Sequence, residues 1–97
     1  MKKFVLLTVG FTTPTPEIMQ SWEQWFKSIK DRIIEQVGLI KGKEITRSGI
    51  SELAMDKEAI TGYLVINAKD IDEAVEIAKR CPMISSTKVY EVMQRNK

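Results

Sequence analysis

Two stretches of the chain are apolar at nearly every position, and they limit the folds that it can adopt. Lys3 to Val9 reads KFVLLTV, and Thr61 to Ala68 reads TGYLVINA. Both have the β-branched and aromatic residues that are typical of strands. A strand that carries apolar side chains on both faces is stable only when both faces are covered. The sequence therefore predicts a sheet whose central strands are covered from two sides.

The alternation of side chains assigns these residues to faces. In the first strand Phe4, Leu6 and Thr8 share one face, and Val5, Leu7 and Val9 share the other. In the later strand Tyr63, Val65 and Asn67 lie opposite Leu64, Ile66 and Ala68, because successive side chains of a strand point to opposite faces.

The remaining segments predict two helices and further strands. Apolar residues recur at helical spacing from Pro16 to Val37, with Thr15 as the N-cap and Gly38 as the terminating glycine. A second helix follows a capping box of Asp70 and Glu73, and Pro82 closes it. Further segments are predicted as a strand at 39–47, an irregular loop or short hairpin at 48–56, and a last strand at 87–93. We expect a single domain over residues 1–97 with an α+β, ferredoxin-like sandwich, a mostly antiparallel sheet with two helices on one face.

Two helices on one face leave the other face of the sheet uncovered. Several exposed Leu, Val, Ile or Tyr side chains would cost several kcal/mol at about 25 cal/mol per Å². A second copy of the same sheet is the simplest cover, which predicts a homodimer packed sheet against sheet. The alternative is that residues 48–60 fold back over the sheet.

Composition excludes several classes of function. The chain has 97 residues, a net charge of +2, one cysteine and no histidine. It therefore lacks a disulfide framework, the commonest metal ligand and the usual general base near neutral pH. We expect no metal, no cofactor, no nucleic-acid partner and no membrane span, and a cytoplasmic location.

The helix that begins PEIMQSWEQWF contains both tryptophans. Trp22 lies in the middle of the apolar stripe, so we predict that it is a core residue. Trp25 lies at the margin of the stripe, where it either packs in the core or at its edge, or forms the wall of a pocket.

Polar residues that interrupt the apolar strands are the candidates for a small-molecule site. Thr8, Tyr63 and Asn67 would project into a cavity if the sheet faces meet in a dimer, or else they bind water and backbone at strand ends. Glu91 is the one acidic residue within the last strand and the candidate catalytic base. Met93 and Arg95 share its face and are candidate ligand contacts. Cys81, at the end of the second helix, is predicted to be buried and unreactive.

The segment KEAITGYLVINAKDIDEAVEIAKRCP resembles the YCII-related, DGPF-domain family of dimeric α+β barrel proteins. The resemblance implies the ferredoxin-like fold and a sheet-to-sheet dimer. The family's Asp-Gly-Pro-Phe signature would fall on Ile50, Ser51, Glu52 and Leu53, so its Gly-Pro turn is absent and this loop can follow another path. Some relatives have a His and Asp suggested as a catalytic pair. The Asp position corresponds to Cys81 here, and no histidine is present to complete the pair.

Three functions follow from these observations. The leading hypothesis is a homodimeric α+β barrel protein that binds a small, partly apolar molecule in a cavity beside the sheet. The first alternative, by analogy of fold, is a cofactor-independent lyase or oxygenase-like enzyme acting on a small ring compound. The second alternative is a structural or regulatory partner protein without a ligand. The sequence leaves open whether the protein is an enzyme.

Overall fold

The computed structural model describes residues 1–94 and has an α+β architecture. Its elements are β1 (Lys2–Val9), α1 (Pro16–Ser28), the short 3-10 helix η1 (Lys30–Arg32), β2 (Ile33–Gly38), β3 (Gly42–Thr46), β4 (Gly49–Leu53), β5 (Ile60–Ala68), α2 (Ile71–Lys79) and β6 (Ser86–Glu91). Four strands form an antiparallel sheet in the order β2-β5-β1-β6, and β3 and β4 form a separate pair. The predicted ferredoxin-like fold is confirmed.

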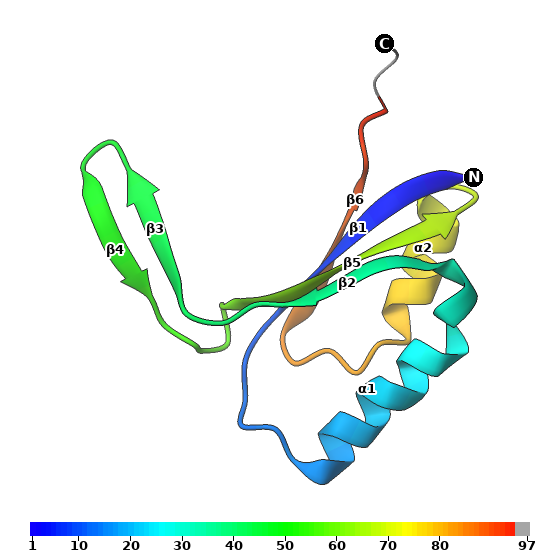
Figure 1. Cartoon of the computed structure of the whole chain (residues 1–97), viewed down its shortest axis with the longest axis horizontal. Coiled ribbons are helices and arrows are strands. Elements are labelled where there is room, and N and C mark those ends of the chain that lie inside the picture. Colours follow the sequence, from blue (N-terminus) through cyan, green and yellow to red (C-terminus); the bar gives the residue numbers. More distant parts are fainter. Residues whose placement is uncertain (95–97) are drawn as a thin grey trace.

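Both helices lie on the same side of the four-stranded sheet (Figure 1). The core between the helices and the sheet consists of Phe4, Leu6, Trp25, Leu64, Ile66, Ala68, Ala74, Ala78 and Cys81. Burial alternates along β5, where the residues that face the helices are buried and their neighbours are half-buried. The predicted division of β1 and β5 into two faces is therefore correct.

Helix α1 is shorter than the sequence predicts. It begins as expected, with Pro16 in the first turn and the Thr15 hydroxyl accepting the N–H of Ile18 at 3.2 Å. It ends at Ser28, whose hydroxyl donates to the carbonyl of Trp25 at 2.6 Å. The predicted continuation to Val37 is wrong, because residues 33–38 form β2 beside β5.

The chemistry of this segment explains the error. Ile33, Ile34 and Val37 are β-branched and favour strands, although the spacing of Ile29, Ile33 and Val37 also fits a helix. The hydrogen bonds that β2 makes to β5 decide between the two conformations. A tertiary contact therefore outweighs the helical spacing of the apolar residues in this segment.

The strand predicted at 39–47 is displaced as well. Its counterpart β3 spans only Gly42–Thr46 and pairs with β4 rather than with the main sheet. Residues 48–56, predicted as an irregular loop or a short hairpin, instead supply a single strand, β4, of a hairpin whose other strand is β3. This β3–β4 hairpin extends away from the sheet (Figure 1), so residues 48–60 do not fold back over it.

The second helix is close to its prediction. The carboxylate of Asp70 accepts the N–H of Glu73 at 2.9 Å, which is half of a capping box. The reciprocal bond goes to the neighbouring residue, because Glu73 accepts the N–H of Lys69 at 2.7 Å. Within residues 1–94, no helix is long and apolar enough to cross a membrane.

Candidate functional site

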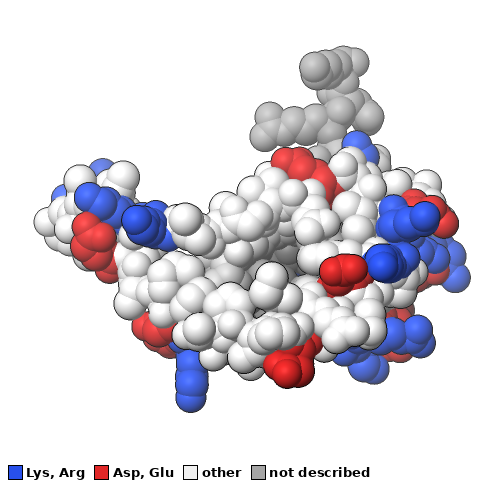
Figure 2. Space-filling view, turned by 60° about the horizontal axis from the view of Figure 1, so that its bottom comes forward, with Lys and Arg blue, Asp and Glu red and all other residues white. Residues whose placement is uncertain are grey.

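The most prominent cavity lies between α1 and the sheet, at the end of β1 that leads into the loop before α1. Its volume is about 560 Å³. The lining residues come from the β1 end and loop (Thr8, Gly10, Phe11, Thr12, Pro14), from α1 (Ile18, Met19, Trp22, Glu23, Phe26, Lys27), from β2 (Gln36, Val37, Gly38), from β5 (Thr61, Gly62, Tyr63, Leu64) and from Ile84. In Figure 2 the middle of this face is hollowed, and the surface around the hollow is largely uncharged.

Helix α1 supplies an apolar and largely aromatic wall. The rings of Trp22 and Phe26 lie with centroids 5.7 Å apart and tilted by 33°. Trp22 also contacts Trp25 edge to face, with centroids 5.7 Å apart and an interplanar angle of 83°. Because Trp25 is buried and its indole N–H donates to the carbonyl of Ile77 at 3.3 Å, this wall is anchored to α2.

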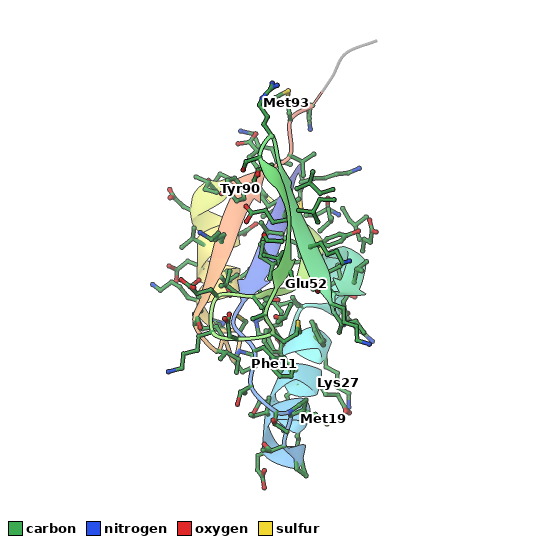
Figure 3. All side chains as sticks on the ribbon, turned by 90° about the vertical axis from the view of Figure 1, so that its left-hand side faces the viewer. Phe11, Met19, Lys27, Glu52, Tyr90 and Met93 are labelled. Atoms are coloured by element: carbon green, nitrogen blue, oxygen red, sulfur yellow. The ribbon has the colours of Figure 1, made fainter. Side chains whose placement is uncertain are left out.

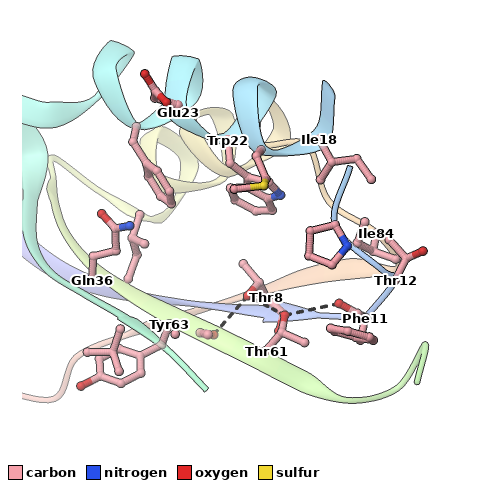
Figure 4. A pocket seen from close by; sticks show the side chains of 18 of the residues that line it. Thr8, Phe11, Thr12, Ile18, Trp22, Glu23, Gln36, Thr61, Tyr63 and Ile84 are labelled. Carbon is pink, nitrogen blue, oxygen red and sulfur yellow. Dashed lines mark hydrogen bonds between the residues drawn. The ribbon is translucent and has the colours of Figure 1, made fainter. Parts of the chain in front are cut away.

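Two threonine hydroxyls lie at the floor of the cavity (Figure 4). The Oγ1 atoms of Thr8 and Thr61 are 3.3 Å apart. The Thr8 hydroxyl can donate to the carbonyl of Gly62 at 3.3 Å, and that of Thr61 to the carbonyl of Gly10 at 3.3 Å or of Thr8 at 3.4 Å. With their protons engaged by the backbone, the two oxygens can still accept hydrogen bonds from a bound molecule.

A strand irregularity creates this floor. The register between β1 and β5 shifts between Thr8 and Val9, as in a β-bulge, and such bulges redirect side chains near functional sites. Gly62 opposite Thr8 keeps the floor open, since a Cβ there would lie 2.9 Å from the carbonyl oxygen of Val37 and 3.4 Å from Thr8 Oγ1.

Charged groups lie at the rim of the cavity. Glu23 and Lys27, one helical turn apart, form an exposed ion pair of 3.4 Å, and the Glu23 carboxylate points away from the cavity in Figure 4. The amide of Gln36 on β2 is also at the rim. Among the described residues no polar side chain is fully buried, so the interior of the cavity is suited to an uncharged ring with a few polar substituents.

The structure places only part of the predicted site in this cavity. Thr8 is at its floor. Tyr63 borders it, but the Tyr63 hydroxyl donates to Glu35 at 2.7 Å on the face of the sheet opposite the helices. That hydrogen bond raises the pKa of the Tyr63 phenol. Asn67 shares the Tyr63 face and does not line the cavity, so Thr8 and Asn67 project to opposite faces of the sheet.

For Trp25 core packing is the correct alternative, since this residue is 6% exposed. Trp22 packs against the core, as predicted, but it is only half-buried and also lines the cavity, which the sequence did not predict. The reason is that α2 packs on the Trp25 side of α1, as the bond to Ile77 shows. The amphipathic stripe does not reveal on which side the second helix lies.

The candidates on the last strand lie away from the cavity. Glu91 is exposed at the far end of β6 and is 3.7 Å from the Lys2 ammonium. Met93 follows the end of β6 and is 78% exposed, and Figure 3 shows it at the opposite end of the molecule from the cavity residue Met19. Arg95 lies outside the described residues.

Sequence reasoning missed Trp22, Phe26, Thr61 and Gln36 as cavity residues. Only Thr61 had a readable signal, because Thr61 and Gly62 together interrupt an otherwise apolar strand, and a glycine in a strand often marks a bulge or a close approach.

Cys81 is buried, as predicted, and lies outside the cavity. Its sulfur is 3.2 Å from the Thr87 hydroxyl, and burial raises the pKa of the thiol above its ordinary value. A thiol in this state is a poor nucleophile and metal ligand. Within residues 1–94, no group of three or more His, Cys, Asp or Glu side chains is arranged to hold a metal ion.

Comparisons with known proteins agree on the fold. The family model described as YCII-related domain matches residues 13–95. The fold is similar to that of the 5-chloro-2-hydroxyhydroquinone dehydrochlorinase TftG from Burkholderia phenoliruptrix AC1100, whose solved structure is a complex with 2,5-dihydroxybenzoquinone. That match has a TM-score of 0.53 at 13% identity and covers 98% of this chain and 93% of TftG. No curated protein matches the sequence.

Proposed function

This chain belongs to the YCII-related domain family, and on that premise we propose that it binds a small, partly apolar ring compound bearing hydroxyl groups. The site is the cavity between α1 and the sheet. Its volume of about 560 Å³ is within the common range for small-molecule sites, about 300–1,000 Å³. The structural neighbour with bound 2,5-dihydroxybenzoquinone supports a ligand of this class.

The Thr8–Thr61 pair is the observation that carries this proposal. Two hydroxyl oxygens 3.3 Å apart, in an otherwise apolar cavity with an aromatic wall, can accept a hydrogen bond from a ring hydroxyl. The aromatic wall of Trp22 and Phe26 offers stacking surface to the same ring.

A matched pair of ligands tests the proposal. Hydroquinone has the hydroxyl donors, and its dimethyl ether has the same ring without them. We expect the protein to bind hydroquinone more tightly, by about two- to twelvefold for one hydrogen bond of about 0.5–1.5 kcal/mol. Calorimetry or the fluorescence of Trp22 measures both affinities.

Variants assign the preference to the cavity. Thr61→Val should abolish the preference for hydroquinone, whereas Thr46→Val, which alters an exposed hydroxyl on the β3–β4 hairpin, should leave it intact. Equal binding of both ligands by the unmodified protein would refute the role of the hydroxyl pair.

We also propose that the protein is a homodimer, packed through the face of the sheet that has no helices. Val5, Leu7, Val9 and Val65 alternate onto that face and are half-buried within one protomer. A second copy would remove these side chains from water and form an isologous interface. Light scattering over a concentration series tests this, and a monomer at all micromolar concentrations would contradict it. The proposed location is the cytoplasm, on the sequence grounds given above.

Catalysis on a ring compound is the second candidate function, favoured by the activity named for the structural neighbour. Glu91 is remote from the cavity, and the other predicted acid-base group, Tyr63, is hydrogen-bonded to Glu35. The Tyr63–Glu35 pair lies on the sheet face opposite the helices, so an enzyme that used it would bind its substrate on that face and not in the α1 cavity. In that case Glu35→Gln should abolish turnover of chlorinated hydroquinones while Glu91→Gln should not. A role as a ligand-free structural or regulatory partner would be favoured if neither binding nor turnover is observed.

A further inference from the structure

The β3–β4 hairpin has few intramolecular contacts that could hold it in place. All residues of β3 and β4 except Gly42 are exposed. The two strands pair with each other in register from Gly42–Leu53 to Thr46–Gly49 and project from the body of the molecule (Figure 1). An isolated two-stranded hairpin is at best marginally stable in water. The hairpin therefore requires a surface to pack against.

One face of the hairpin is suited to burial. Ile45 and Ile50 are cross-strand partners that are 76% and 68% exposed. On the same face, Lys43 and Glu52 are also cross-strand partners and form an ion pair of 3.4 Å. An apolar centre beside an internally paired charge resembles the core and rim of a protein interface. Glu44 and Ser51 occupy the opposite face.

The size of the molecule supports a second copy as the occupant. The radius of gyration is 14.7 Å, whereas a compact chain of this length has about 12.5 Å. The accessible surface is 7471 Å², about 1,800 Å² more than a compact monomer of this mass exposes. A standard interface buries about 800 Å² per partner, so this excess area is larger than the area that one protomer needs to contribute to a stable dimer.

The hairpin is also continuous with the surface assigned to the dimer. It leaves the sheet next to β2 and β5 and rises on the side away from the helices, where the uncovered sheet face lies (Figure 1). We propose that the β3–β4 hairpin is an arm that packs its Ile45–Ile50 face against the second copy of this chain. This inference rests on the proposed dimer, in which each arm flanks the sheet of the other protomer.

Two adjacent residues on β4 provide a matched test. Ile50→Lys and Ser51→Lys add the same charge on the same strand but on opposite faces, and both positions are exposed in the protomer. We expect Ile50→Lys to raise the dimer dissociation constant by about tenfold or more, whereas Ser51→Lys changes it by less than about twofold. Light scattering and analytical ultracentrifugation give these constants, and thermal unfolding of the diluted proteins verifies that both variants fold.

Hydrogen exchange gives an independent readout. The amides of the arm should become protected as protein concentration rises through the dissociation constant. If Ile50→Lys dimerises with unchanged affinity and the arm amides stay unprotected, the arm does not pack against the second copy, although the sheet-to-sheet dimer still forms. A monomer at all concentrations would overturn both, and arm amides protected in that monomer would indicate an occupant other than a second copy.

Discussion

Arg32 and Glu73, which are 41 positions apart, form a 2.9 Å ion pair that joins the segment after α1 to the first turn of α2. The Glu73 carboxylate also accepts the backbone N–H of Lys69 at 2.7 Å. Both contacts hold the pKa of Glu73 below its ordinary value of 4.5. The hydrogen bond from Lys69 lowers this pKa most, and the hydrogen bond from Arg32 comes second. One carboxylate thus links the end of β5, α2 and η1.

The Glu73 carboxylate makes the stability of the protein dependent on pH in the acidic range. A carboxyl whose pKa is lower in the folded state stabilises that state at pH values above its unfolded pKa, and this contribution disappears as the pH falls through the folded pKa. As the pH decreases below about 4.5, we expect the unfolding free energy of the wild type to decrease more steeply than that of Glu73→Gln. Urea unfolding between pH 7 and pH 3 measures the difference, and parallel curves would contradict the prediction.

The two tryptophans should differ in their effect on stability. Trp25→Phe removes the hydrogen bond to Ile77 and leaves a void in the core, so we expect a loss of about 1–3 kcal/mol. Trp22→Phe alters a half-buried cavity wall, and we expect a loss of less than about 1 kcal/mol. Denaturant unfolding measures both losses.

Fluorescence separates the same two residues. Trp25→Phe retains Trp22 in the cavity wall and should keep the fluorescence response to hydroquinone, whereas Trp22→Phe should lose most of it. Equal losses of stability, or a response carried by Trp25, would contradict the assignment of Trp22 to the cavity and Trp25 to the core.

Gly62 is predicted to tolerate no side chain. A Cβ at this position would lie 2.9 Å from the backbone oxygen of Val37, so β2 would have to move. We expect Gly62→Ala to destabilise the protein by about 1–3 kcal/mol. Gly38→Ala is the matched control on the paired strand, because a Cβ there has no atom within 4 Å, and its effect should remain within about 1 kcal/mol. Thermal unfolding of both variants compares them directly, and similar melting temperatures would argue against the close approach.

The Cys81 thiol should be unreactive in the folded protein. It is buried, its sulfur contacts the Thr87 hydroxyl, and burial raises its pKa. We expect a thiol reagent at pH 8 to label Cys81 slowly in buffer and rapidly in denaturant, because the thiolate is the reactive form. Equally rapid labelling in buffer would indicate that the end of α2 opens readily.

The sequence was informative where one conformation satisfies both the local pattern and the tertiary contacts. In β1 and β5 the alternation of Leu6 with Leu7 and of Leu64 with Val65 defines two faces in any sheet, and these faces were predicted correctly. The segment from Ile29 to Val37 fits a helix and a strand equally well. Only the hydrogen bonds to β5 make this segment a strand, and the local sequence does not reveal that β5 will lie beside it.

The candidate site was harder to predict because it depends on distances between elements. The cavity exists where α1 stands away from the bulged end of β1 and β5. Gly62 is a local signal for the bulge, but the distance between α1 and the sheet has no local sequence pattern. Thr8 was found because it interrupts an apolar strand. Trp22 was assigned to the core because helical periodicity defines an apolar stripe but does not say which part of the stripe meets the sheet.

At the base of the β3–β4 hairpin segment the two chain ends meet, because the N–H of Leu39 donates to the carbonyl of Thr61 at 2.9 Å. The hairpin Gly42–Leu53 is therefore an insertion between β2 and β5, which are already neighbours, whereas Asp56 and Ala59 accept the N–H groups of the cavity residues Phe11 and Gly10. Such an insertion can lengthen, shorten or change its side chains while the framework around the cavity stays the same. Under the proposed arm and cavity, assembly and ligand recognition would accordingly diverge independently in proteins built on this plan, and a shortened hairpin would alter the first without the second.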